Sequence, residues 1–292
     1  MKNWFRKSKE DSRAALRDAL AGQEPPTFQA GVASLLADIR NPDTPNQHIV
    51  RQLESHPALV VGVLRMVNSA SFGAARQIDT LDHAVSLLGR SALELFVLGQ
   101  MCREALPLPV APGFDARRFW TSSFARAGLA RALSDRLHPA EGPRCFVAGL
   151  LQDMAVPLAA SARPEEYGKA LEAWHASPEV NLSEVERELL GWTHEELGAH
   201  LGVVWELPNS LVQIIGDHHT TTGDLRPYED SGLPAVRLVS NYRETLRKHG
   251  VEVLVEQARS RFELDPDWVL NAVEESEAEA KVLAASLLRK AG

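Results

Sequence analysis

The sequence predicts an all-α protein, and three observations carry this prediction. The first is the helical spacing of apolar residues, clearest in Pro57–Ser69, where they recur at i, i+1, i+4, i+5 and i+8 along one face. The second is a pair of capping patterns, Ser183 with Glu186 and Thr193 with Glu196, each suited to the free amides of a first helical turn. The third is that no run of alternating residues bounded by turn signals predicts a sheet.

Taken along the chain, the same period predicts a succession of helices. A dense apolar set in His83–Leu106 predicts a core helix, which ends at a loop marked by Pro107, Pro109, Pro112 and Gly113. Further helices are predicted over Phe114–Leu137, Pro143–Ser161, Glu165–His175, Ser183–Leu190, Thr193–Trp205 and Pro208–His219. An exposed linker is predicted over Thr220–Ser231, and more helices after it, the last over Asp267–Lys290.

Composition and charge exclude several classes of protein. Of the 292 residues, 45% are hydrophobic and 24% are charged, the balance of a globular protein with a sizeable core. The net charge of -8 disfavours binding to nucleic acid, which needs clustered lysine and arginine. The basic start lacks the apolar segment of a secretory signal, and no stretch approaches the roughly 20 apolar residues of a transmembrane helix. We therefore expect a cytoplasmic protein that binds no nucleic acid.

An ordered series of motifs carries a family resemblance. It starts with His56-Pro-Ala-Leu59, Asn68-Ser-Ala70 and the segment from Ile78 to Gly89. It continues with Phe119-Trp120, the segment from Phe146 to Met154, Gly191-Trp-Thr-His194, Gly198, Trp205-Glu-Leu-Pro208 and His218-His219. This series resembles the HDOD family, the HD-related output domain of bacterial signalling proteins.

The resemblance implies a fold and a division of the chain. The fold is a multi-helix, HD-like bundle with additional C-terminal helices. Residues 1–26 are expected to be an N-terminal extension, mobile or helical, and residues 27–222 the HDOD domain. Residues 223–292 are expected to be a linker and C-terminal helices that pack on the domain or on a partner.

The resemblance also implies what a catalytic site would need. HD phosphohydrolases bind a divalent metal through a histidine, an adjacent His-Asp pair and a distant aspartate, and the metal activates water for attack on phosphorus. Carried onto this chain, those positions fall at Ser122, at Gln152 with Asp153, and at Asn241. Serine and neutral amides are poor ligands for a catalytic transition metal, and one carboxylate does not hold it alone. We therefore expect no catalytic residue, no bound metal and no cofactor.

The histidines of the series leave two interpretations open. His218 lies on the apolar face of its predicted helix, with His219 beside it, which is typical of core histidines bonded to a neighbouring carbonyl or carboxylate. His194 begins a helix, where exposure is the default. The alternative is a remnant cleft that binds a nucleotide or a cyclic dinucleotide without hydrolysing it. It would be lined by Ser122, Gln152, Asp153, His194, His218, His219 and Asn241.

The remaining acidic clusters are expected on solvated helical faces, including Glu184, Glu186 and Glu188. The function predicted first is a non-enzymatic signal-transduction module that acts through contacts with a partner protein. The alternative is an HD-type, metal-dependent phosphohydrolase with altered ligands, and metal content separates the two. A nucleic-acid-associated regulator is a third class, which the acidic balance disfavours.

Overall fold

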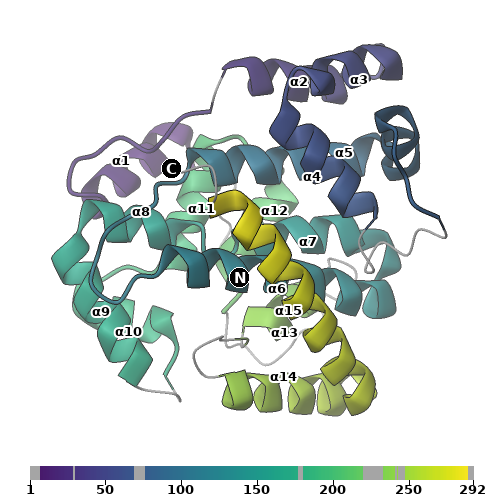
Figure 1. Ribbon diagram of the computed structural model, residues 1–292. Helices are drawn as coiled ribbons and strands as arrows, with labels where there is room; N and C mark the ends of the chain where they lie inside the picture. The colour runs from purple at the N-terminus through teal and green to yellow at the C-terminus, as the bar shows by residue number, and fades with distance from the viewer. Residues whose placement is uncertain are drawn as a thin grey trace. The chain divides into compact units, whose positions relative to one another are not determined.

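The computed structural model describes residues 7–28, 30–68, 76–176, 180–219, 233–240, 242 and 247–288. Almost every regular element in these ranges is an α-helix, and none of them is a strand. The all-α prediction is therefore confirmed. The chain forms two compact units: a smaller one, Thr27–Ala105, and a larger one made of Met1–Pro26 and Leu106–Gly292 (Figure 1).

The smaller unit is built from apolar helix faces that meet in one core. Leu35, Leu53, Val63 and Leu93 are buried there, each from a different helix. The helices in its described part are α2 (Ala30–Arg40), α3 (Asn46–Glu54), α4 (Pro57–Val67) and α5 (Leu81–Ala105). The predicted helix over His83–Leu106 matches α5, which is broken at Gly89, where φ is 70°.

Asn68 ends α4. Its side-chain amide donates to the carbonyls of Leu64 and Ile78, both at 2.7 Å, and its side-chain oxygen accepts from the Ile78 N–H at 2.7 Å. The backbone of Asn68 is not left-handed, since its φ is -98°. The side chain of Asn68 therefore links the last turn of α4, at Leu64, to Ile78.

The larger unit is organised around α6 (Ala116–Leu137), whose residues are buried through most of its length. Three helices cover α6: α7 (Gly142–Leu151), α13 (Leu233–Ser240) and the C-terminal α15 (Pro266–Leu288) (Figure 1). A short 3-10 turn, Pro139–Glu141, joins α6 to α7, and α14 (Arg247–Phe262) packs against α15. The C-terminal helices therefore form part of the core of this unit.

The rest of the larger unit surrounds α11 (His194–Val204). α11 packs against α12 (Asn209–Asp217), α1 (Lys9–Ala19) and α8 (Ala155–Ala162). α8 packs in turn on α9 (Pro164–Ala176), and α9 on α10 (Leu182–Leu190). These helices bring the start of α11 and the end of α12 together beside the turn that follows α7.

The single helix predicted over Pro143–Ser161 is wrong, because α7 and α8 are separate. A turn over residues 152–154 divides them. Pro157 explains the break, since its ring would clash with the carbonyl of Asp153 in a continuous helix and it has no N–H to donate. The break takes Gln152 and Asp153 out of regular structure.

One of the two predicted capping boxes is confirmed and the other is displaced. Thr193 and Glu196 cap α11, with the Glu196 N–H donating to Thr193 Oγ1 at 3.3 Å. α10 is capped by Asn181 with Glu184 and not by Ser183 with Glu186. The shift of the helix start leaves Glu186 free to enter the interior, and it is fully buried rather than on a solvated face.

Two helical stretches, Leu81–Ala105 and Pro139–Ala162, are long and apolar enough to cross a membrane by length and composition. Their apolar windows are 50% and 78% buried inside the protein. Core helices of a folded domain meet the same criterion.

Candidate functional site

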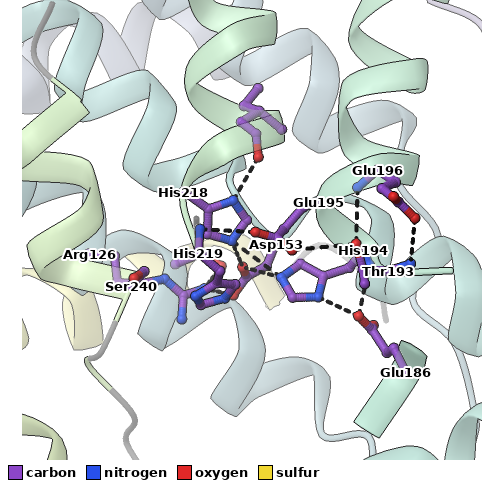
Figure 2. A network of polar contacts seen from close by, with 12 residues as sticks. Arg126, Asp153, Glu186, Thr193, His194, Glu195, Glu196, His218, His219 and Ser240 are labelled. Carbon is purple, nitrogen blue, oxygen red and sulfur yellow. Dashed lines mark hydrogen bonds and ion pairs between the residues drawn. The ribbon is translucent and has the colours of Figure 1, made fainter. Parts of the chain in front are cut away.

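Four side chains with metal-ligand chemistry converge in the larger unit (Figure 2). Asp153 comes from the turn between α7 and α8, His194 from the first position of α11, and His218 and His219 from the end of α12. One ligand atom from each of the four lies within 4.8 Å of the others. The sequence suggested that Asp153 is the only metal-ligand side chain left at this place, but three histidines lie beside it. We call these four residues the Asp-His cluster.

Arg126 holds the carboxylate of this cluster. Its Nη2 lies 2.6 Å from Asp153 Oδ2, and the arginine side chain is only 8% exposed. Asp153 Oδ1 lies 3.5 Å from His194 Nε2 and 3.3 Å from His218 Nε2. Burial opposes ionisation of Asp153, but the Arg126 guanidinium and the two histidines together hold the pKa of this carboxyl well below its usual value.

Glycine makes the pairing of Arg126 with Asp153 possible. A Cβ on Gly149 of α7 would lie 2.8 Å from the Arg126 carbonyl and 3.1 Å from Ala127 Cα. A Cβ on Gly198 of α11 would lie 2.9 Å from a methyl of Ile215. Both glycines therefore allow a close approach, of α7 to α6 at Gly149 and of α11 to Ile215 of α12 at Gly198.

A second buried carboxylate holds His194. Its ring Nδ1 lies 2.7 Å from Glu186 Oε2, and the same oxygen accepts from the His194 backbone N–H at 2.8 Å. The other oxygen of Glu186 accepts from the Tyr167 hydroxyl, whose ring stacks on Trp192. The expectation that His194 is exposed is wrong, since it is 1% exposed.

The buried carboxylates change the pKa values of His194 and Tyr167. Burial opposes protonation of His194, but Glu186 and Asp153 outweigh it and raise the pKa of the imidazole well above its usual value. Burial and the Glu186 carboxylate raise the pKa of Tyr167. His194 is therefore an imidazolium between two carboxylates, and Tyr167 stays neutral and donates a hydrogen bond to Glu186.

His218 and His219 complete the cluster. His218 is fully buried, and its Nδ1–H donates to the Ile215 carbonyl at 2.7 Å, as expected of a core histidine. Its Nε2 lies 3.2 Å from His194 Nε2. Burial and the neighbouring His218 and His194 lower the pKa of His219 well below its usual value. The backbone N–H of His219 donates to Glu195 Oε1 at 3.0 Å.

The donor set suits a transition metal by residue type, since three imidazoles and one carboxylate are common ligands of zinc, iron and manganese. One observation opposes such an ion. The guanidinium of Arg126 is already paired with the carboxylate of Asp153. A metal would have to displace the arginine from this ligand.

The other predicted site residues are placed differently. Ser122 is 9% exposed and lines a cavity together with Arg126 and Asp153. Gln152 is 1% exposed, it is not part of the Asp-His cluster, and neither polar atom of its side chain has a hydrogen-bond partner within the described ranges. Asn241 lies outside the described residues.

Arg126 and Glu186 are the two functional residues that sequence reasoning missed. Arg126 stands four residues after Ser122, one helical turn along the same face of α6, so its proximity to the ligand positions was available from the spacing. Glu186 also had a signal in its spacing. It stands four residues after Leu182 and directly after Val185, and these three residues form the buried face of α10.

Comparison with known proteins agrees with this fold. An uncharacterized protein from Treponema pallidum (strain Nichols) is 25% identical over 198 residues, which are 66% of this chain and 37% of that protein. The chain thus matches little more than a third of the length of this relative.

Two crystal structures have the same fold. The first, from Shewanella amazonensis SB2B, bears the provisional name of a phosphohydrolase and has a TM-score of 0.69 and 23% identity, over 92% of this chain and 97% of that one. The second, an HDOD domain protein of unknown function from Geobacter sulfurreducens, has a TM-score of 0.68 and 20% identity, over 94% and 98%. The family model of the HDOD domain matches residues 26–221. This chain therefore belongs to the HDOD domain family.

Proposed function

We propose that this protein is a non-enzymatic, cytoplasmic signal-transduction module that acts through contacts with a partner protein. The observation that carries the proposal is the pair of Arg126 with Asp153, 2.6 Å apart and largely removed from solvent. The guanidinium supplies the positive charge that a catalytic ion would supply, in a form that polarises no water. Hydrolysis of a phosphate ester in this fold needs a metal-bound water.

The surrounding residues support the same function. Ser122 and Gln152 replace two of the ligand positions implied by the family resemblance. The acidic and basic groups of the site balance one another, since Arg126 and the imidazolium of His194 offset Asp153 and Glu186. Such a closed network fixes the relative positions of α6, α10, α11 and the turn after α7. It is suited to holding a surface in one conformation.

Affinity capture from the native cell tests whether the chain binds a partner protein. Val282 of α15 is 63% exposed, which is unusual for a large apolar side chain on a core helix, and a partner would cover it. With the full chain as bait, we expect a specific protein to be retained, and Val282→Asp to retain several-fold less of it. Leu189→Asp, at a comparably exposed position on α10 (53%), is the matched control and should retain as much as the unaltered chain.

Hydrolysis assays supply the outcome that contradicts the proposal. The purified chain should not hydrolyse bis(p-nitrophenyl) phosphate with added manganese, iron or zinc. Turnover that disappears in Asp153→Ala would overturn the proposal.

A second candidate function, a metal-dependent phosphohydrolase with rearranged ligands, is favoured by one observation. The Asp-His cluster brings four metal-ligand side chains within 4.8 Å of one another. This function requires Arg126 to leave Asp153. Under it, Arg126→Met should increase metal affinity and turnover together, whereas under the first proposal the same change only weakens the fold.

A further inference from the structure

A cavity of about 80 Å³ opens in the larger unit beside the Arg126–Asp153 pair. Its walls are apolar and largely aromatic, with Phe114, Phe119 and Trp174 all partly exposed and Leu171 and Leu182 buried behind them. Arg126, Asp153 and Ser122 form its polar end. An apolar slot with a few convergent polar groups is the usual form of a small-molecule site.

The polar end carries an unused hydrogen-bond donor. Arg126 is 7% exposed, and its Nη2 is held by Asp153 at 2.6 Å and by Ser123 Oγ at 3.5 Å. Its Nε–H has no hydrogen-bond partner within the described ranges. A buried donor without a partner is costly, and an acceptor atom of a bound molecule would remove that cost.

The charges around the cavity cancel. Arg126 is paired with Asp153 at the inner end. Asp115 and Arg118 lie at the outer end, where Asp115 caps α6 by accepting from the Arg118 N–H at 2.9 Å. The lining therefore favours a molecule with little or no net charge, one that offers an acceptor such as a carbonyl oxygen.

The size of the cavity limits the molecule to one ring. An apolar cavity of about 150 Å³ admits benzene. The enclosed space here is smaller but open at one end, so it admits at most one planar ring, and any further part of a larger molecule stays outside. Two stacked bases of a cyclic dinucleotide do not fit within it.

From these observations we infer that the cavity binds a single planar aromatic ring that carries a carbonyl acceptor. The ring lies between Phe119 and Trp174, and its carbonyl accepts from the Nε–H of Arg126. Aromatic rings gain from offset or edge-to-face contact with such walls. This inference rests on the proposed function, because it supplies the signalling module with a small-molecule input at the Arg126–Asp153 pair.

Saturation-transfer NMR and calorimetry on the full chain, in buffer with EDTA, test the inference. The probes are benzamide and nicotinamide as planar single rings, cyclohexanecarboxamide as the non-planar match, and a cyclic dinucleotide as the larger ligand. We expect the two planar amides to bind and to compete with one another. The saturated amide and the cyclic dinucleotide should bind at least tenfold more weakly.

Three substitutions locate the binding. Trp174→Ala removes one wall and should weaken binding roughly tenfold. Arg126→Lys keeps the cation beside Asp153 but removes the planar Nε–H, and it should weaken binding by a similar factor. Trp268→Ala, at another half-buried tryptophan away from the cavity, is the control and should change nothing.

The outcomes separate this inference from the proposed function. Equal binding of planar and saturated amides, no binding of any probe, or loss of binding in Trp268→Ala would overturn the cavity assignment and leave the signalling proposal standing. Binding that appears only after a metal ion replaces EDTA would move the ligand to the Asp-His cluster, and would overturn both.

Discussion

Asp153 keeps a negative charge in a largely buried place because a guanidinium and two imidazoles surround it. The carboxylate is 18% exposed, so water alone would not stabilise it. Arg126 provides the shortest of its contacts and His194 adds a second positive charge. A buried ion pair of this kind is strongly destabilised when one partner is removed and the other stays charged.

Arg126→Met should therefore lower the free energy of unfolding by about 3–5 kcal/mol. Asp153→Asn in the same chain should restore more than half of that loss, because a neutral amide no longer needs a cation. Urea unfolding of the two single variants and the double variant measures the coupling. Arg131→Met, at a buried arginine of the same helix whose partner Asp135 is 44% exposed, is the control and should cost less. If the effects of Arg126→Met and Asp153→Asn on the free energy of unfolding are fully additive, Arg126 does not stabilise the charge of Asp153.

At the scale of elements, the position of the site depends on where helices stop. Pro157 ends α7 early and places Asp153 in a turn, and Asn181 with Glu184 caps α10, which leaves Glu186 out of the capping box. Most helices were predictable because their apolar period is long. These two boundaries were not predicted, because a single proline or a competing cap decides them over one or two residues.

The contact between α1 and α11 should make the stability of the folded chain depend on pH. His200 of α11 is 7% exposed and lies 3.1 Å, through Nδ1, from Ser12 Oγ of α1. Burial, with the Lys7 ammonium adding to it, lowers the pKa of His200 to about 4. In the unfolded chain a histidine has a pKa of about 6.5. The unfolded state therefore binds the extra proton first as the pH falls, and stability should be lost between those two values.

Urea unfolding at about pH 7.5 and about pH 5 measures this loss. His200→Gln retains a side chain that can bond Ser12 and cannot titrate in this range, so it should lose less stability over the same interval. An equal loss in the unaltered chain and in His200→Gln would assign the pH dependence to other groups.

At the scale of the whole molecule, the family and the all-α fold were predictable from the order of short motifs along the chain. The chemical state of the site was not. The sequence singled out Ser122, Gln152 and Asp153 as candidate site residues, but the residues around Asp153 come from α6, α10, α11 and α12, which are distant in sequence. Only the folded chain brings three histidines to Asp153 and pairs its carboxylate with Arg126.

Anomalous X-ray diffraction from crystals of the full chain grown with excess manganese tests this central claim most directly. The account predicts that the guanidinium of Arg126 stays on Asp153 and that no anomalous peak appears among Asp153, His194, His218 and His219. A peak at bonding distance from these side chains, with Arg126 turned away from the carboxylate, would contradict it.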